Sequence, residues 1–162
     1  MGFRKVIKTI LPLVALAILL SACGKSVIEE YADAEIVISG ITDSEFVITP
    51  RELLAMETVS RTATGETQKA GTVGAEGPLL ETFLAEYGCK PTDFAKIRFI
   101  AYDEYKTTLR NEYLTDFEVI MAVSSGDKPL AEVNRPLRLL IPGAESNMWI
   151  YGVVRIEFER AA

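Results

Sequence analysis

Histidine is absent from the 162 residues of this chain, and its absence removes several classes of function. Serine and cysteine hydrolases of the triad type use an imidazole as their general base. The common histidine ligand sets of zinc and haem are missing for the same reason. The chain therefore cannot form a Ser-His-Asp site, a Cys-His site or a histidine-based metal site from its own residues.

A long hydrophobic run is also lacking. The apolar stretch 10–20 covers about 11 residues, whereas a helix that spans a bilayer needs about 20. Arg4, Lys5 and Lys8 precede this stretch and Pro12 lies inside it. This arrangement favours a secretory signal over a stable membrane-spanning helix.

The signal-like segment closes on Leu20-Ser21-Ala22-Cys23-Gly24, which resembles the lipobox of bacterial lipoproteins. The resemblance implies that the Cys23 thiol takes a diacylglycerol and becomes the first residue after cleavage of residues 1–22. Each buried CH₂ of a palmitate-type acyl chain contributes about 0.8 kcal/mol, so two or more chains anchor a protein stably. We expect an extracytoplasmic protein, anchored by lipid at the outer leaflet of the cell membrane or at a periplasmic face. The alternatives are an uncleaved anchor and an ordinary signal that is cut nearby.

Cysteine is scarce, with only two residues of this type in the chain. Because Cys23 is assigned to lipid, Cys89 has no partner for an intrachain disulfide. Cys89 follows Gly88 at an expected helix end, where we interpret it as a small apolar residue or a free thiol. A redox role would need a partner thiol or a cationic environment, and Lys90 alone provides little of the latter.

Basic residues are in the minority, with 17 Lys and Arg against 23 Asp and Glu. The signal contains three of the basic residues and no acidic one, so the mature chain has 14 (17 − 3) and a net charge of −9 (14 − 23). An acidic body disfavours nucleic acid and anionic lipid surfaces as partners. The expected partners are the membrane, through the lipid anchor, and an unknown small molecule or envelope protein.

The mature chain is long enough for one domain with its own core, which we place at residues 35–160. Residues 23–34 are polar and acidic, and we expect them to be a tether between lipid and domain. Val27, Ile28 and Tyr31 fall at helical spacing, however, so a first helix that packs on the domain is an equal alternative.

Short runs of alternating apolar and polar residues predict strands at 35–40, 44–48, 58–63, 97–101, 106–109, 118–123, 137–141 and 149–158. Thr49, Pro50 and Glu52 form an N-terminal capping pattern that predicts a short helix. A second helix is predicted over 78–87, ended by Gly88. Many short strands with two short helices indicate an α+β domain with mixed β-sheets.

The stretch 64–77 holds four glycines and is expected to be the longest loop. Long loops on compact domains are often where binding occurs, so this loop is a candidate part of a site. Glu66 and Glu76 could hold a cation together with backbone carbonyls, but their spacing matches no known calcium loop.

Three patterns follow one another at the C-terminal end: Asn134-Arg-Pro-Leu-Arg-Leu-Leu-Ile-Pro-Gly143, then Trp149, then Val154-Arg-Ile-Glu-Phe158. Together they resemble the end of the molybdopterin-binding domain of the sulfite oxidase family. In that family a G-x-P-x-R-L-x-x-P-G strand and loop leads to a tryptophan segment and a final R-I-E-hydrophobic strand. Weaker similarities occur upstream in the same order, at 44–56, 77–84 and 99–105. The resemblance runs over about residues 35–159 and implies a sulfite-oxidase-like molybdopterin-binding fold.

The chain departs from the catalytic members of this family where they hold their molybdenum-binding cysteine. The corresponding strand, 59–63, leads here into Thr62-Ala-Thr-Gly-Glu66, and Cys89 falls beyond the next helix. Histidine and most of the basic groups that cradle a pterin pyrophosphate are missing too. Arg4-Lys5 replaces the Arg-Arg pair that exports cofactor-loaded proteins. We therefore expect a relative without a cofactor, with molybdopterin as the alternative.

The former cofactor face is expected to consist of the 64–77 loop, the 102–105 turn and the 142–149 loop. On this face an aspartate would accept from a ligand N–H or O–H, and two arginines would meet a carboxylate or phosphate. Met148 and Trp149 would form an apolar lip. The alternatives are a tight turn for the aspartate, exposure to solvent or pairing with glutamate for the arginines, and core packing or surface capping for Met148 and Trp149. The candidate residues are Thr64, Gly65, Tyr102, Asp103, Tyr105, Arg135, Arg138, Met148 and Trp149.

These observations together predict a membrane-anchored extracytoplasmic lipoprotein whose domain acts as a ligand-binding or protein-interaction module. No catalytic residue and no metal ligand is predicted. One alternative is a molybdopterin-dependent oxidoreductase, or its accessory subunit, with an atypical site. Another is a purely structural envelope lipoprotein, which would form large stable complexes and have no pocket.

Overall fold

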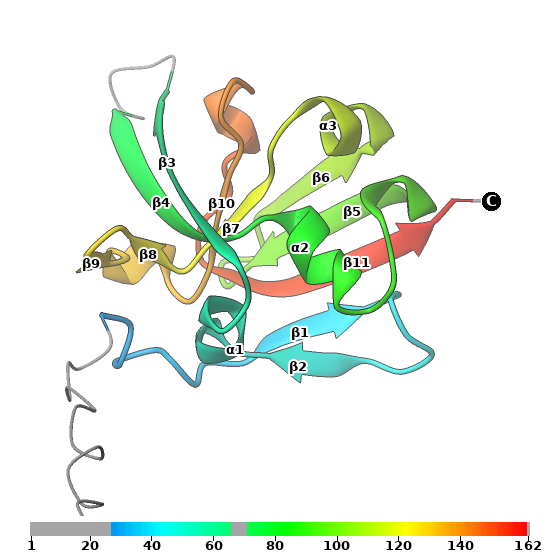
Figure 1. Cartoon of the computed structure of the whole chain (residues 1–162), viewed down its shortest axis with the longest axis horizontal. Helices are drawn as coiled ribbons and strands as arrows, with labels where there is room; N and C mark the ends of the chain where they lie inside the picture. Colours follow the sequence, from blue (N-terminus) through cyan, green and yellow to red (C-terminus); the bar gives the residue numbers. More distant parts are fainter. Residues whose placement is uncertain (1–26, 66–70, 162) are drawn as a thin grey trace, which may run out of the picture.

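A computed structural model describes residues 27–65 and 71–161 (Figure 1). The predicted signal over 1–22, the lipidation site Cys23 and Glu66 of the glycine-rich stretch lie outside the described residues. Within the described part of the chain, no helix is both long enough and apolar enough to cross a membrane.

The largest sheet has five strands in the order β2-β1-β11-β5-β6 (Figure 1). These strands are β1 (Ile36–Ser39), β2 (Phe46–Ile48), β5 (Phe94–Ala101), β6 (Lys106–Arg110) and β11 (Val153–Arg160). β1 and β11 pair in parallel, and every other pairing in this sheet is antiparallel. The side chains of β5 alternate between buried and more exposed positions, as expected for a strand with one face on a core.

Two smaller sheets complete the β structure. One has the order β3-β4-β8-β9, and the other pairs β10 with β7. Their strands are β3 (Thr58–Thr64), β4 (Thr72–Pro78), β7 (Ile120–Ala122), β8 (Ser124–Ser125), β9 (Lys128–Pro129) and β10 (Arg138–Leu140). β7 is buried along its whole length, since it lies between the other layers. The mixed sheets agree with the fold predicted from the sequence.

The predicted capping pattern forms the start of α1 (Pro50–Leu54). Thr49 Oγ1 accepts from the backbone N–H of Glu52, and the Glu52 carboxylate accepts from the backbone N–H of Thr49. The second predicted helix is α2 (Leu80–Ala85), and the chain turns at Gly88, whose φ is +67°. A third short helix, α3 (Asn111–Asp116), was not predicted, because Leu114 alone is buried in it and no helical periodicity results. Three 3₁₀ turns also occur: η1 (Pro91–Asp93), η2 (Glu132–Asn134) and η3 (Ser146–Met148).

The prediction of one long loop over 64–77 was wrong for its second half, which is strand β4. β4 pairs with β3 along its full length, from Thr58 opposite Pro78 to Thr64 opposite Thr72. Glycine occurs at position 77 of this strand because the backbone of β7 comes very close to it. A Cβ on Gly77 would lie 2.0 Å from the carbonyl oxygen of Met121. Gly77 therefore serves strand packing, whereas a Cβ on Gly71 would meet nothing within 4 Å.

One core cluster joins the sheets and helices. Its aromatic part lies at α2, where the ring of Phe158 packs between two others. The ring centroid of Phe158 is 6.3 Å from that of Phe83 and 5.0 Å from that of Phe94. Such contacts add to the burial of apolar area, which is the main stabilising contribution of the core. A second, smaller cluster consists of Ile28, Tyr31, Ala32 and Leu130.

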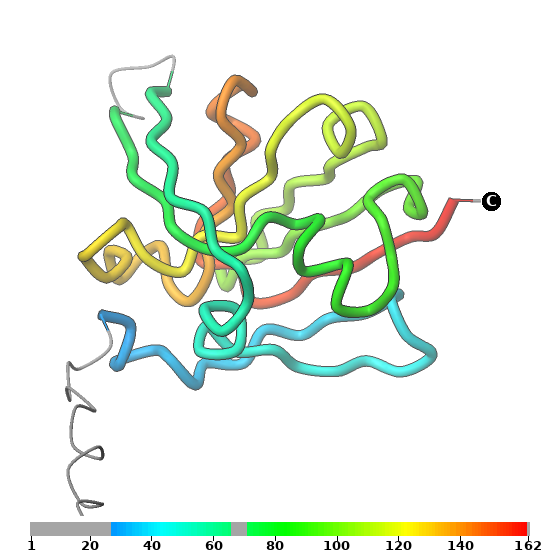
Figure 2. The backbone as a smooth tube through the Cα atoms, viewed as in Figure 1, coloured from blue at the N-terminus to red at the C-terminus, as the bar shows by residue number. Residues whose placement is uncertain are grey.

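The second cluster places the N-terminal segment on the body of the domain. Residues 27–33 form turns, and Figure 2 shows their tube (blue) beside the hairpin of β8 and β9 (yellow). The Tyr31 hydroxyl donates to the carbonyl of Val123 at 2.7 Å and accepts from the N–H of Leu130 at 2.9 Å. The part of the expected tether that lies within the described residues is thus packed against the domain.

Candidate functional site

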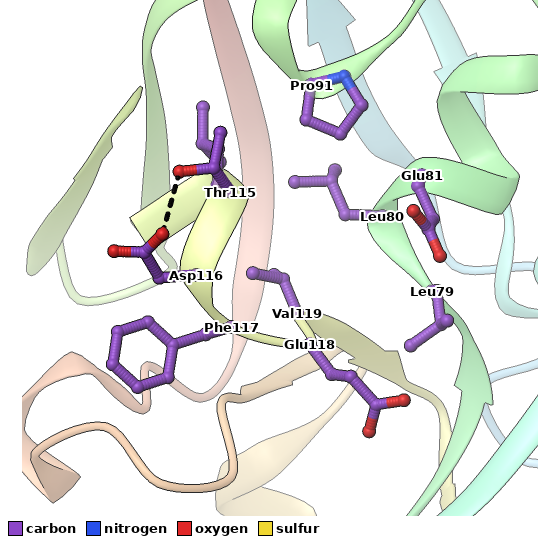
Figure 3. Close-up of a pocket in the computed structure, with 10 residues that line it drawn as sticks. Leu79, Leu80, Glu81, Pro91, Thr115, Asp116, Phe117, Glu118 and Val119 are labelled. Atoms are coloured by element: carbon purple, nitrogen blue, oxygen red, sulfur yellow. Dashed lines mark hydrogen bonds between the residues drawn. The ribbon is translucent and has the colours of Figure 1, made fainter. Parts of the chain in front are cut away.

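Four hollows on the described surface are candidates for a site. One, of about 330 Å³ between α3 and the loop before η3, has only acidic charged groups in its lining, namely Glu112, Asp116 and Glu145. The first of the other three lies between α2 and α3 and has a volume of about 280 Å³ (Figure 3). Its charged lining is entirely acidic, with the carboxylates of Glu81, Asp116 and Glu118. Arg61 donates to Glu118 at 2.9 and 3.0 Å, and this hydrogen bonding lowers the pKa of the Glu118 carboxyl. The negative lining disfavours any ligand that carries phosphate.

The second hollow, called here the Trp149 hollow, has a volume of about 260 Å³. It is formed where the turn after β5 meets the segment from η3 to Tyr151. Its lining consists of Ala101, Asp103, Tyr105, Ser146, Asn147, Trp149, Ile150 and Tyr151. Three aromatic residues with a few polar groups give it the composition of a small-molecule site.

The orientations of two lining residues are fixed by hydrogen bonds. Trp149 is buried, and its Nε1 donates to the carbonyl of Ile141 at 2.9 Å. Asp103 Oδ1 accepts from the N–H of Tyr105 at 3.1 Å, which closes the turn after β5. Asp103 thus has the turn role that was one of its two interpretations, and its second oxygen has no hydrogen bond among the described residues. The hollow therefore has a fixed aromatic wall and a carboxylate acceptor.

Arg138 lies beside this hollow on β10. Its backbone forms a β-bridge with Tyr151, which lines the hollow. Its Nε is buried and has no hydrogen-bond partner within the residues that the structure describes. Burial lowers the pKa of the guanidinium, while the nearby Tyr151 acts in the opposite direction. A buried guanidinium N–H without an acceptor is costly, and a ligand acceptor would satisfy it.

The third hollow is wide and shallow, with a volume of about 800 Å³. It is lined by Tyr102, Glu132, Val133, Arg135, Pro136 and Val154. Arg135 is held by donating to the carbonyl of Leu130 at 2.9 Å and to the carboxylate of Glu30 at 2.6 Å. Its predicted pairing with glutamate therefore occurs, and its guanidinium also lies over the Tyr31 ring, 4.8 Å from the centroid.

The structure thus brings some of the predicted site residues together and separates others. Asp103, Tyr105 and Trp149 line the Trp149 hollow, whereas Tyr102 and Arg135 line the third hollow. Met148 packs on the core cluster. Thr64 and Gly65 lie at the far end of the β3–β4 hairpin, where their contacts are to Thr72 and Gly71.

Five residues that line the Trp149 hollow are not among the named candidates: Ala101, Ser146, Asn147, Ile150 and Tyr151, of which Ser146 and Asn147 lie in the 142–149 loop of the predicted face. The sequence does contain a hint for Tyr151, since this aromatic residue lies two positions after Trp149, on the same face of an extended segment. The structure leaves Tyr151 exposed and Trp149 buried. Ser146 and Asn147 were placed in a loop, and nothing local distinguishes them from ordinary loop residues.

Cys89 lines none of these hollows. Cys89 is a buried free cysteine whose Sγ is 3.6 Å from the carbonyl oxygen of Tyr87 and 3.6 Å from Nη2 of Arg160. These contacts fit its interpretation as a free thiol of the domain interior. Among the described residues, no group of three or more His, Cys, Asp or Glu side chains is arranged to hold a metal ion.

Comparisons with known proteins give two findings. A family model described as the oxidoreductase molybdopterin binding domain matches residues 25–162. A solved structure of the sulfane dehydrogenase SoxCD from Paracoccus pantotrophus is similar, with a TM-score of 0.64 and 24% identity, over 81% of this chain and 39% of that one. This chain therefore spans less than half of the SoxCD chain, and the likeness shows the fold alone. No curated protein sequence matches this chain.

The expectation of a domain without a cofactor is contradicted by the family match, because molybdopterin binding describes the family whose model covers 25–162. The expectation rested on the missing molybdenum-ligand cysteine, on the missing histidine and basic groups, on the nearness of the lipid anchor and on a signal with Arg4-Lys5 in place of an Arg-Arg pair. It underestimated Arg138, whose buried Nε lacks an acceptor. This orphaned donor fits a carbonyl or phosphate oxygen of a pterin cofactor, and the aromatic side chains of the Trp149 hollow fit a ring system.

The fold and the family match agree with the resemblance drawn from the closing strands of the sequence. The match covers more than half of the chain, from just after Cys23 to the last residue. The chain belongs to the oxidoreductase molybdopterin-binding domain family, with a sulfite-oxidase-like fold.

Proposed function

We propose that this protein is a lipid-anchored extracytoplasmic module that binds a molybdopterin-type cofactor at the Trp149 hollow. The observation that carries the proposal is the buried Nε of Arg138, which lacks an acceptor among the described residues and lies next to Tyr151 of the hollow wall. The family match supports the class of ligand. The hollow between α2 and α3 has three carboxylates in its lining, whereas the Trp149 hollow has one, Asp103, so the former is the less favourable of the two for a phosphate-bearing cofactor.

Arg138, which lies beside the hollow, and the groups that line it would each have a definite task in holding the cofactor. Arg138 would donate to a carbonyl or phosphate oxygen, and Asp103 would accept from an N–H of the pterin. Trp149, Tyr105 and Tyr151 would shield the ring system from water. When bound, a molybdopterin cofactor supplies the redox chemistry of its molybdenum. The residues of this chain would bind the cofactor, orient it and exclude water from one side of it.

We propose binding as the role of this chain because it lacks the cysteine that the family's catalytic members use as a molybdenum ligand. No cysteine occurs in the β3–β4 segment 58–78, and Cys89 is buried near Tyr87 and Arg160. The alternative is an oxidoreductase, or its accessory subunit, with an atypical site. The description of the matching family as an oxidoreductase domain favours this alternative.

The proposed anchor rests on the lipobox-like pentad at residues 20–24 and the basic, apolar segment before it. A lipid on Cys23 would place the domain outside the cytoplasm on a membrane surface. The cofactor would then be held close to that surface, where a membrane-bound or envelope protein could meet it.

The test is the cofactor content of the protein made in a host that synthesises molybdopterin. Native mass spectrometry gives the bound mass, and metal analysis gives molybdenum per chain. We expect the wild-type protein to carry a pterin and Arg138→Met to lose it. Arg98→Met is the matched control, because Arg98 is an arginine on β5 already paired with Glu157 at 2.8 Å.

A wild-type protein without pterin, or equal pterin in both variants, would contradict the proposal. Pterin with molybdenum, together with turnover of a redox dye, would favour the oxidoreductase alternative. Pterin without turnover would favour the binding module.

A further inference from the structure

The N-terminal segment is fixed on the domain by a set of side-chain contacts that the cofactor site does not use. The Tyr31 hydroxyl joins Val123 and Leu130, and Arg135 links the Tyr31 ring to the Glu30 carboxylate. Farther along the segment, the N–H of Arg51 donates to the carbonyl of Ala32 at 3.0 Å. The start of the described chain is therefore held in one place relative to the sheets.

The distance from this fixed point to the proposed lipid is short. Val27 follows Cys23 by four residues, and a fully extended chain covers at most about 3.6 Å per residue, or roughly 14 Å in all. A chain of this length leaves little freedom to turn the domain. The surface around Val27 must therefore lie near the membrane whenever Cys23 carries lipid.

That surface continues into the third hollow, because Arg135 belongs to both. Arg135 contacts Tyr31 and Glu30 of the N-terminal segment and also lines the hollow. The hollow presents two large exposed side chains, Tyr102 at 54% and Val133 at 50%. Tyrosine and arginine are residue types that suit the boundary between lipid and water, since each joins an apolar body to a polar end.

Charge does not provide the attraction. Glu30 and Glu132 lie at the edge of the same surface, and Glu132 is exposed. These carboxylates would repel an anionic lipid surface. Contact with lipid would depend on the acyl anchor, with the apolar side chains resting at the headgroup level.

We propose that the surface formed by Val27, Tyr102, Val133 and Arg135 rests on the bilayer interface. This inference depends on the lipid anchor of the proposed function, and it does not depend on the cofactor. It assigns the third hollow to zwitterionic lipid headgroups. It also fixes the orientation of the domain, so that the start of β5 points away from the membrane.

The test compares Val133, which lines the third hollow with Tyr102, with Ala95 near the start of β5. Tyr102 follows the C-terminal end of this strand, and the exposed Ala95 lies near its start, seven residues earlier and about 23 Å away at 3.3 Å per residue. A fluorescent label is placed on Val133→Cys for the proposed membrane surface and on Ala95→Cys for the opposite end. Both carry Cys89→Ala, so that only the introduced thiol reacts.

The full-length protein, processed in a lipoprotein-exporting host, is reconstituted in phosphatidylcholine vesicles with headgroup-labelled nitroxide lipid. We expect the label at position 133 to be quenched at least about threefold more than the label at 95, since interfacial groups lie within about 10 Å of the headgroup boundary. Equal quenching on a chain that mass spectrometry shows to be lipidated would overturn the inference alone. The third hollow would then be free for a protein partner or a second copy.

A mature chain whose mass shows no lipid would overturn the anchor and this inference together. The pterin content of the same preparation tests the cofactor proposal separately.

Discussion

The hydroxyl of Tyr31 is a single atom whose removal should measure how firmly the N-terminal segment is attached. Tyr31→Phe keeps the ring and its contact with Arg135, but it leaves the carbonyl of Val123 and the N–H of Leu130 without this partner. Each buried hydrogen bond contributes about 1 kcal/mol net, and orphaned partners add to the cost. We expect the free energy of unfolding to fall by about 2 kcal/mol. For a domain of this size, that corresponds to about 6 °C in Tm.

Thermal unfolding followed by circular dichroism measures this change. Tyr105→Phe is the matched control, because it deletes the same atom from a side chain that is 55% exposed. The control should shift Tm by less than about 1 °C, as surface changes usually do. If Tyr31→Phe were as stable as Tyr105→Phe, the two hydrogen bonds would not hold the segment, and the membrane orientation argued from them would fail.

The same variant makes a pH prediction with a definite sign. Burial raises the pKa of Tyr31 above its ordinary value of 10.0. A group whose pKa is raised by folding contributes stability that is complete below the unfolded-state pKa and is lost as pH rises through the folded-state pKa. The stability difference between wild type and Tyr31→Phe should therefore be constant from pH 7 to 9 and shrink above pH 10. A difference that grew above pH 10 would refute the assignment.

Three further changes have expected outcomes. Gly77→Ala places a Cβ 2.0 Å from the Met121 carbonyl oxygen and should lower the free energy of unfolding in urea by about 3 kcal/mol. Gly126→Ala is the control: its Cβ has open space, so only the positive φ should cost stability, by about 1 kcal/mol. Equal losses of stability in the two variants would contradict the packing argument. Thr49→Ala removes the cap of α1 and should cost about 1 kcal/mol by the same measurement, while Thr49→Ser should restore most of it. Arg138→Met should leave the stability of the cofactor-free domain unchanged or slightly higher, because it removes a buried donor that has no acceptor among the described residues. The same variant should lose cofactor binding. A large loss of stability would show that the arginine has a structural role.

The parts of the fold that were predicted correctly are those with local causes. The start of α1 follows from Thr49, Pro50 and Glu52, which lie within four positions and satisfy their own backbone groups. The end of α2 follows from Gly88, which adopts a positive φ. Strands such as β5 follow from alternation along a few residues. In each case, short-range sequence determines the conformation, and tertiary packing agrees with it.

The parts that were missed depend on contacts between distant segments. Glycine in β4 indicates a loop by composition, yet Gly77 is required by the approach of Met121, more than 40 positions away. The Trp149 hollow combines the turn after β5 with a segment about 45 positions later, so its outline does not exist in any single stretch of sequence. Arg138 matters because its buried Nε has no hydrogen-bond acceptor among the described residues, and only the three-dimensional structure shows that this atom is buried.

The place of β11 in the largest sheet has a consequence for how the chain is completed. β11 is the most C-terminal strand of the described residues, yet it lies between β1 and β5, with Val37 opposite Arg155. Pairing across this separation requires closure of almost the whole domain, which makes folding slow. Until β11 arrives, β1 and β5 each have an unpaired edge open to other chains. Loss of residues 153–162 should therefore leave the two parts of the sheet, β2-β1 and β5-β6, with no strand to join them, and the chain would remain a substrate for proteases.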